Sequence, residues 1–378
     1  MKILVIGPPL YGLLYPVVSL AHAFRSNGHD VVLATGGAMT EQVIHAGLPT
    51  FNAAPGLDPD AEYRRQEASR KQRNLGTKPG GFAFFSEEMS DNLVEFTRAY
   101  QPDLIVYPPL GVAARLLGSK FGIPTVLQTV GFAHQPTHVN TVTRALEPAL
   151  RRHGVPHILE APHQDLRWID VAPPSMSVLD YPKAEVVPMR YVPYNGGTEL
   201  HVRDVHAEDE QGQRRILVSL GTLKPMVDGL DLISWITKQA EELDAQFTVQ
   251  LRTNARAGLP AQLPPNVQLV DWLGPDAYHQ ADLFIHHGGA GNTFTALSHA
   301  IPQVIFGEGA DRPHNAAIVR NRGCGVLPPE TGLSAEFLRG VMGDEELRRQ
   351  AHAVAAELAA MPAPATVAAQ LSDLVRAP

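Results

Sequence analysis

The chain has 378 residues, a formal net charge of -8 and one cysteine. This length favours two domains over one and allows a large buried core. The negative charge and the absence of a long basic run argue against nucleic acid as a partner. A single cysteine excludes an internal disulfide and fits a reducing, cytoplasmic setting. No apolar stretch approaches the roughly 20 residues needed to cross a bilayer, so we expect no membrane span.

The N-terminal segment predicts a strand, a helix and a second strand. Residues 1–9 begin as an apolar strand that two prolines end, and residues 31–35 form the next strand. The helix between them covers residues 16–25, with Pro16 in its first turn. The intervening loop lacks the G-x-G-x-x-G pattern, and no acidic residue follows the second strand. A dinucleotide site is therefore disfavoured.

The rest of the N-terminal half alternates between loops, helices and strands. Residues 52–81 are rich in proline, glycine and charge, which predicts a mobile surface loop that either covers an acceptor or has no role. Residues 82–98 predict an amphipathic helix. Strands follow at 103–108 and 124–129, with a helix at 111–121 between them. This alternation indicates an α/β domain.

The two halves meet in a segment marked first by proline and then by charge. Prolines recur between residues 173 and 197, and a charged stretch covers residues 203–215. The second half repeats the strand–helix alternation, and a proline break at 362–364 precedes a last helix at 365–375. We therefore expect two α/β domains and a separate C-terminal helix.

The most informative stretch of the second half covers residues 282–306. An apolar strand leads into His286 and His287, a glycine-rich turn follows, and a helix then opens with Asn292 as a candidate N-cap. Glycines let backbone N–H groups approach a ligand closely, and the helix dipole adds partial positive charge. Such a corner is suited to bind phosphate. The alternative is a glycine-rich turn without a ligand, as in any α/β protein.

Other candidate residues follow the neighbouring predicted strands. Thr222 ends a strand at 216–222, and Trp272, at the end of another strand, can stack on a nucleobase or fill a core position. A further strand after the glycine-rich corner leads to Asp311 and Arg312. Ligands of open α/β sheets lie at the carboxyl ends of strands, so we expect these segments to face one crevice.

Five motifs follow one another in this half, namely S-L-G-T, D-W, H-H-G-G-A-G-N-T, a Pro-Gln strand and D-x-x-x-N-A. In this order they resemble the donor half of the GT-B glycosyltransferases, most closely the actinomycete enzymes that attach activated sugars to antibiotic and polyketide aglycones. The resemblance covers nearly the whole chain. It implies an α/β protein with two Rossmann-like domains facing across a deep cleft and a C-terminal helix that crosses back to the N-terminal domain.

The resemblance also implies domain limits and a reaction. The expected parts are an acceptor-binding domain at 1–200, a linker at 201–214, a donor-binding domain at 215–360 and the crossover helix at 361–378. The expected reaction is an inverting transfer of a deoxygenated sugar from a nucleoside diphosphate, dTDP above all, to a hydrophobic aglycone in antibiotic biosynthesis. O- and C-glycosyl transfer stay open. The nucleotide sugar is a substrate, so no cofactor and no metal are expected, and a homodimer is left open.

The donor residues implied by the resemblance divide by the part of the substrate that they contact. The set for the diphosphate is Thr222, His286, Gly288, Gly289, Gly291, Asn292 and Thr293. Trp272 and Leu273 would contact the base, and Asp311 and Arg312 the sugar. Arg312 stands where many relatives have glutamine, which disfavours an ordinary glucose donor.

The two histidines of the corner require a choice. They are adjacent on a strand and so point to opposite faces, which argues against a shared metal. The H-x-G pattern of the family favours His286 as the residue that meets the diphosphate. His287 is then expected to have a packing or hinge role.

The first loop departs from the family pattern. Most relatives have G-H-x-x-P before the first helix, with the histidine as general base, whereas this chain has Leu13, which cannot take a proton. Three explanations stay open: a base elsewhere in the acceptor domain, a nucleophile such as an aromatic carbon, or a non-catalytic accessory protein. A nucleotide-sugar epimerase is a further alternative.

For a displaced base we predict His134, which follows the strand at 124–129 and titrates in the right range. A surface histidine without a role is the competing interpretation. Tyr11, Glu87 and Asp91 are weaker base candidates. The residues expected on the acceptor side are Tyr11, Leu13, Phe85 and Glu87.

Overall fold

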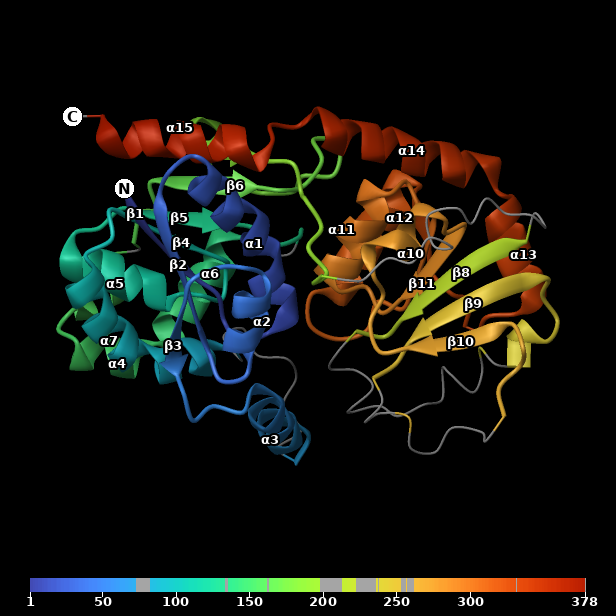
Figure 1. Cartoon of the computed structure of the whole chain (residues 1–378), viewed down its shortest axis with the longest axis horizontal. Coiled ribbons are helices and arrows are strands. Elements are labelled where there is room, and N and C mark those ends of the chain that lie inside the picture. The colour runs from blue at the N-terminus through green and yellow to red at the C-terminus, as the bar shows by residue number, and fades with distance from the viewer. Residues whose placement is uncertain are drawn as a thin grey trace. The chain divides into compact units, whose positions relative to one another are not determined.

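The computed structural model describes residues 1–72, 82–132, 135–161, 163–197, 213–221, 236, 238–252, 256, 262–330 and 332–377. The chain divides into two compact units, each with its own parallel sheet (Figure 1). Unit 1 comprises Met1–Ala172, Ser177–Tyr194 and Met361–Pro378, and unit 2 comprises Pro173–Met176 and Asn195–Ala360. Both units therefore draw on more than one segment of the chain.

The described part of unit 1 has a seven-stranded sheet in the order β3-β2-β1-β4-β5-β6-β7. Its strands are β1 (Lys2–Ile6), β2 (Asp30–Gly36), β3 (Thr50–Ala54), β4 (Leu104–Tyr107), β5 (Thr125–Gln128), β6 (Arg167–Asp170) and β7 (Val186–Pro188). All neighbouring pairs are parallel. The apolar run of β1 is buried from Ile3 to Ile6, as expected for a parallel strand covered on both faces.

Helices follow the strands of unit 1 and cover this sheet. They are α1 (Tyr11–Ser26), α2 (Met39–His45), α3 (Pro59–Gln72), α4 (Ala83–Tyr100), α5 (Ala113–Phe121), α6 (Pro136–Ala145), α7 (Glu147–Arg152), the 3-10 turns η1 (Pro156–Leu159) and η2 (Lys183–Glu185), and the C-terminal α15 (Pro364–Arg376). The amphipathic helix, the two strands and the intervening helix predicted between residues 82 and 129 are confirmed as α4, β4, α5 and β5.

Two local predictions for unit 1 are wrong. The first helix begins at Tyr11, so Pro16 lies inside α1, and no side chain caps its start. Part of the predicted loop at 52–81 is the helix α3, in which Arg65 pairs with Glu62 one turn earlier. Such a charged helix lacks the apolar periodicity on which sequence prediction relies. Residues 73–81 lie outside the described part.

Unit 2 has a six-stranded parallel sheet, within the described residues, in the order β10-β9-β8-β11-β12-β13. Its strands are β8 (Arg214–Ser219), β9 (Ala245–Gln250), β10 (Val267–Val270), β11 (Leu283–His286), β12 (Gln303–Ile305) and β13 (Gly325–Val326). Its helices include α10 (Pro275–His279), α11 (Ala290–Ser298), α12 (Arg312–Arg322), α13 (Ala335–Gly343) and α14 (Glu345–Ala360).

The predicted last helix is confirmed as α15, which belongs to unit 1 although unit 2 precedes it in the chain. It packs on α1 (Figure 1). The side-chain amide of Asn27 donates to the Ala365 carbonyl at 3.0 Å, and Ser372 Oγ lies 2.7 Å from His29 Nε2. The C-terminal segment therefore completes the N-terminal unit.

A buried ion pair holds several elements of unit 1 together. The guanidinium of Arg115 on α5 donates to Asp165 Oδ2 at 2.7 Å, and both side chains are at most 2% exposed. Arg115 also donates to the Tyr107 hydroxyl at 2.6 Å and to Asn140 Oδ1 at 2.7 Å. Buried charges are tolerated only when they are paired and hydrogen-bonded, and this network meets both conditions.

Candidate active site

The sheet of unit 2 reverses its winding direction between β8 and β11. From β8 the chain moves to β9 and β10 on one side, and from β11 it moves to β12 and β13 on the other. Ligands of doubly wound sheets bind outside the carboxyl ends of the strands at such a switch point. The glycine-rich corner follows β11 at this place.

The carboxyl end of β8 forms one wall of the switch point. Ser219 Oγ donates to Gln250 Oε1 at 2.9 Å and accepts the N–H of Gly221 at 3.2 Å. Gly221 has φ +73, and a Cβ at this position would lie 2.6 Å from His287 Cε1. The strand end is therefore fitted to the imidazole of His287.

His286 is a core residue of the sheet. Its side chain is 0% exposed, Nε2 lies 2.9 Å from Gln303 Oε1, and Nδ1 accepts the N–H of Gly288 at 3.1 Å. Burial lowers the pKa of His286 to about 4, although the hydrogen bond with Gln303 opposes this change. Both ring nitrogens are thus engaged, and the neutral ring holds the Gly288 peptide from inside the protein.

His287 lies on the opposite side of the strand and is only half-buried. Its ring is enclosed by two glycines, because a Cβ on Gly289 would come within 2.4 Å of Nε2 and one on Gly221 within 2.6 Å of Cε1. Nδ1 lies 3.5 Å from Asn292 Nδ2 on α11. His287 therefore occupies the junction between the end of β8 and the start of α11.

The helix α11 begins earlier than the sequence predicts. Gly289, with φ -63 and ψ 146, is the N-cap, and Asn292 lies inside the first turn, so the predicted Asn292 cap is wrong. The hydroxyl of Thr293 donates to the Gly289 carbonyl at 3.0 Å. The first N–H groups of a helix have no intrahelical acceptors, so the amides that follow Gly289 are suited to an anion.

The turn after β12 brings Asp311 and Arg312 to the same corner. The side chain of Asn315 donates to Asp311 Oδ2 at 2.9 Å and to the carbonyl of Gly288 at 3.0 Å. Arg312 Nη1 donates to the Glu308 carbonyl at 3.0 Å, which closes the turn before α12. Asp311 and Arg312 are both half-buried.

Trp272 and Leu273 follow β10 and differ in exposure. Leu273 is 1% exposed and packs in an apolar cluster with Phe284. The half-buried Trp272 donates its indole N–H to the carbonyl of Asn195. Two predicted site residues, Thr222 and His134, lie outside the described part of the chain.

The sheet of unit 1 has its own switch point between β1 and β4, where α1 begins. Tyr11 is half-buried, and its ring meets that of Tyr15 edge-on at 5.1 Å between centroids. Leu13 is 7% exposed and belongs to the apolar core. On the carboxyl side of β3, residues of β3, α3 and α4 line a hollow of about 570 Å³.

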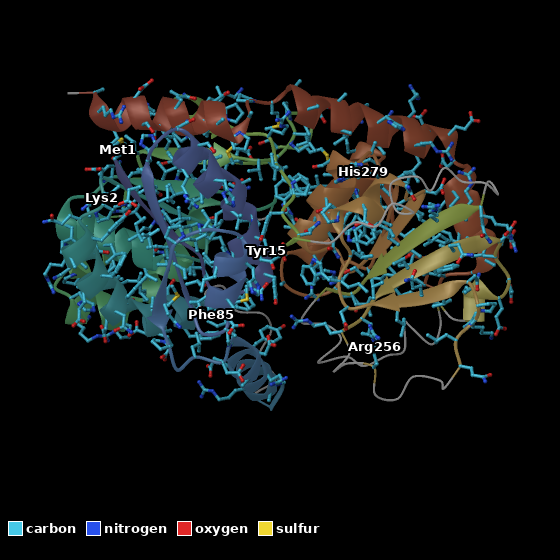
Figure 2. All side chains as sticks on the ribbon, viewed as in Figure 1. Met1, Lys2, Tyr15, Phe85, Arg256 and His279 are labelled. Atoms are coloured by element: carbon cyan, nitrogen blue, oxygen red, sulfur yellow. The ribbon has the colours of Figure 1, made fainter. Side chains whose placement is uncertain are left out.

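Phe85 and Glu87 serve the packing of α4. Phe85 is 0% exposed (labelled in Figure 2). The carboxylate of Glu87 accepts the guanidinium of Arg152 at 3.0 Å and the N–H of Ala149 at 3.2 Å, both from α7. These contacts give the two side chains a structural role.

Asp91 is tied to the same helix pair. Burial by itself raises the pKa of Asp91, but hydrogen bonds from Arg152 and His153 outweigh it and lower the pKa below its ordinary value. Its Oδ1 lies 2.9 Å from Arg152 Nε and 2.6 Å from His153 Nε2. A carboxylate paired in this way is a weak proton acceptor.

Sequence reasoning did not identify Ser219, Gly221 or Gln303 as parts of the site, and it gave Asn315 no role. The signals for these residues were the S-L-G-T motif, the Pro-Gln strand and the D-x-x-x-N-A spacing. Outside this corner, burial raises the pKa of Asp170 at the carboxyl end of β6, although the hydroxyl of Ser177 donates to it at 2.5 Å.

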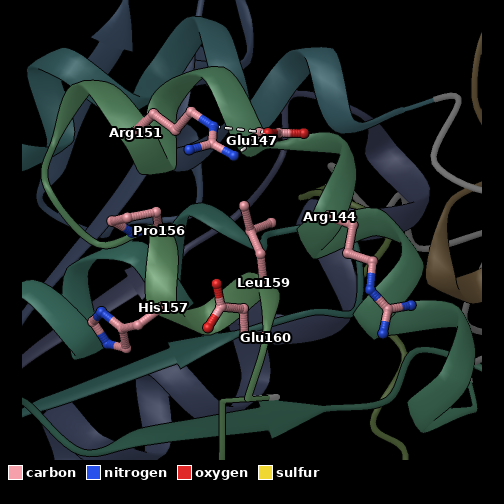
Figure 3. Close-up of a pocket in the computed structure, with 7 residues that line it drawn as sticks. All are labelled: Arg144, Glu147, Arg151, Pro156, His157, Leu159 and Glu160. Carbon is pink, nitrogen blue, oxygen red and sulfur yellow. Dashed lines mark hydrogen bonds and ion pairs between the residues drawn. The ribbon is translucent and has the colours of Figure 1, made fainter.

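A separate hollow of about 510 Å³ lies on unit 1 among α6, α7 and η1 (Figure 3). It carries both charge signs, and its Arg151 and Glu147 pair with each other at 2.7 Å. None of the predicted site residues lines it. Among the described helices, none is long and apolar enough to cross a membrane.

Comparisons with known proteins cover most of the chain. The domain family described as "Erythromycin biosynthesis protein CIII-like, N-terminal domain" matches residues 22–221, and the corresponding C-terminal domain family matches residues 234–374. The TDP-daunosamine transferase DnrS of Streptomyces peucetius is 30% identical over 426 residues, which cover 99% of this chain and 97% of the relative.

Two solved structures extend this likeness to the fold. The glycosyltransferase SnogD from Streptomyces nogalater has a TM-score of 0.82 at 30% identity, with 99% of each chain covered. The Streptomyces sp. SF2575 glycosyltransferase SsfS6, complexed with thymidine diphosphate, has a TM-score of 0.79 at 25% identity, again with 99% of each chain covered. The predicted GT-B fold class is confirmed.

Proposed function

Because the chain belongs to the erythromycin biosynthesis protein CIII-like glycosyltransferases, we propose that it transfers a deoxygenated sugar from a thymidine diphosphate donor to a hydrophobic natural-product aglycone, with inversion at the anomeric carbon. The observation that carries this proposal is the corner at the β8/β11 switch point. It combines a half-buried imidazole with a helix start at the place where doubly wound sheets bind their ligands.

The diphosphate binds at the start of α11. Negative charge builds up on the leaving diphosphate during transfer, and fixed donors aimed at that charge lower the barrier. The amides after Gly289 supply such donors, and His287 stands beside them. We assign the histidine contact to His287 instead of His286, because the ring of His286 is fully buried and both its nitrogens are engaged.

The nucleoside and the sugar are held on either side of the diphosphate. Trp272 stacks on the thymine, and its indole N–H, bound to Asn195, fixes the plane of the ring. Asp311 accepts sugar hydroxyls, and Arg312 limits the space next to it. The name of the relative DnrS refers to a TDP-linked sugar, and SsfS6 was crystallised with thymidine diphosphate, which supports thymidine as the base.

Unit 1 binds the acceptor. The half-buried Tyr11 at the β1/β4 switch point and the hollow beside β3 supply the surface. Leu13 belongs to the core and cannot take a proton, so the base lies elsewhere, and we retain His134 as the proposed base. His134→Ala is expected to lower turnover at least about a hundredfold with donor binding intact. Near-wild-type turnover would remove His134 from the site.

Calorimetry with thymidine, thymidine diphosphate and uridine diphosphate tests the donor site. We expect the wild type to bind thymidine diphosphate most tightly. His287→Ala should weaken that binding roughly 10- to 100-fold, as for a hydrogen bond to a charged group, and leave thymidine binding unchanged. His299→Ala is the matched control, since His299 follows the other end of α11 and contacts the Thr295 carbonyl. Equal binding by wild type and His287→Ala would contradict the assignment.

Mass analysis of reactions with a TDP-deoxysugar and an aromatic polyketide tests the transfer itself. Addition of one sugar to the acceptor supports the proposed function. An isomerised sugar formed from the donor alone would indicate an epimerase instead. A wild-type protein that binds no nucleotide would favour an accessory role.

A further inference from the structure

We propose that Asn315 is a positioning residue that holds the Asp311 carboxylate in a fixed place relative to the Gly288 peptide, and so links recognition of the sugar to recognition of the diphosphate. The inference rests on the proposed function of this corner and adds a residue to it. Its basis is one side-chain amide that donates to both partners, to Gly288 O at 3.0 Å and to Asp311 Oδ2 at 2.9 Å.

The orientation of this amide follows from its neighbours. Both partners are acceptors, so the NH2 group must face them, and its two hydrogens are then used up. Asn315 is 0% exposed, and its Oδ1 is a buried atom without a hydrogen-bond partner among the described residues. Leaving a buried acceptor unpaired costs stability. We expect such a cost in stability at a residue whose role is to position neighbouring groups.

The backbone of Gly288 is held at both of its polar groups, which belong to consecutive peptide units. Its N–H is held by His286 Nδ1 at 3.1 Å and its carbonyl by Asn315. Gly288 has φ +89, and a Cβ on it would lie 2.9 Å from Ile305 Cγ2 and 3.3 Å from Arg312 Cβ. The first turn of α12 therefore packs directly on the corner, which leaves no room for a side chain there.

The carboxylate of Asp311 is the group that Asn315 positions for the ligand. It stands at the N-cap position of α12 but its side chain makes no capping hydrogen bond. Oδ2 is held by Asn315, whereas Oδ1 has no hydrogen bond to another described residue. The half-buried carboxylate thus keeps one oxygen for a hydroxyl-bearing ligand next to the diphosphate corner.

The test compares thymidine diphosphate with thymidine diphosphate-rhamnose by calorimetry on the full chain. The measured quantity is the affinity for thymidine diphosphate-rhamnose divided by the affinity for thymidine diphosphate. This ratio isolates the contribution of the sugar to binding. We expect Asn315→Asp, which keeps the shape but places a second carboxylate beside Asp311, to reduce that ratio at least tenfold. Asp311→Asn should reduce it similarly, and the double variant should lose no more than either single variant, because the two residues act as one unit.

A matched control separates positioning from general structural damage. The amide of Asn266 donates only to the carbonyls of Ala240, Leu243 and Ala245, away from the corner, so Asn266→Asp should lower stability and leave the ratio unchanged. If Asn315→Asp fails to fold, Asn315→Ser removes the amide without adding charge and carries the same expectation.

The outcomes distinguish the inference from the proposed function. A wild type that binds neither ligand refutes the proposed function and the inference with it. A wild type that prefers the nucleotide sugar, together with an Asn315 variant that keeps the preference, refutes the inference alone. Additive losses in the double variant would also overturn it, because they would show that Asn315 does not act through Asp311.

Discussion

The buried imidazole of His286 makes the stability of unit 2 depend on pH. Burial lowers the pKa of His286 from 6.5 to about 4 in the folded protein. As the pH falls, the unfolded chain therefore takes up a proton before the folded chain does. The stabilisation that comes from keeping this ring neutral is complete above about pH 6.5 and is lost as the pH falls toward about 4.

The magnitude follows from the same two values. Each tenfold change in proton affinity is worth about 1.4 kcal/mol, so the full loss is about 3 kcal/mol, of which about 2.5 kcal/mol is expected by pH 4.5. The protonated ring cannot gain hydration in the folded state, since the side chain is 0% exposed and is hydrogen-bonded to Gln303 and Gly288. A loss of this size is a large fraction of the total stability of a typical domain.

Amide hydrogen exchange of peptides that cover β11, between pH 7.5 and 4.5, measures this effect in unit 2 alone. The reference is His286→Gln, which has a neutral polar side chain that does not titrate. Subtracting the two opening free energies at each pH removes the contributions of all other groups, including the half-buried His299. The reasoning is refuted if the difference between wild type and variant stays constant over the whole pH range.

Three further predictions concern other parts of the chain. Gly221→Ala should weaken thymidine diphosphate binding at least tenfold, because its Cβ would collide with the ring of His287. Gly47 has the same φ of +73 but nothing near its Cβ, so Gly47→Ala should cost only about 1 kcal/mol of stability and no affinity. Calorimetry and thermal unfolding would separate these effects. Trp272→Ala should weaken the same binding by about 1–3 kcal/mol, and unchanged affinity would remove the stacking role. Arg115→Met should destabilise unit 1 by about 3–5 kcal/mol in urea unfolding, because it leaves the buried Asp165 carboxylate without its charged partner; a loss below about 1 kcal/mol would contradict the pairing argument.

The strands around the site were predictable because each apolar run is followed closely by glycine or by polar residues. The stretch from β11 to β12 shows this, since its strand, turn and helix were all expected from the glycines and the flanking apolar residues. The helix starts were less predictable. Leu10 and Gly289, which precede α1 and α11, are N-caps that make no side-chain hydrogen bond, so no characteristic residue marks the boundary.

The choice between His286 and His287 shows a limit of pattern reading. Alternation along a strand predicts that the two rings point to opposite faces, but not which face is covered. That depends on the helix packed against the strand: Phe284, on the same face as His286, belongs to the apolar cluster that includes Ala296 of α11. The position of Asn315 likewise depends on how α12 approaches Gly288, which no local pattern encodes.

The return of the chain to unit 1 after unit 2 matters for building hybrid enzymes from related transferases. A single crossover after Tyr194 would exchange α15 together with unit 2, so the contacts of Asn27 with Ala365 and of His29 with Ser372 would join residues from different parents. A second crossover before Met361 avoids this mismatch. Apart from the short Pro173–Met176 segment, such a double exchange transplants unit 2 alone and leaves unit 1 with its own last helix.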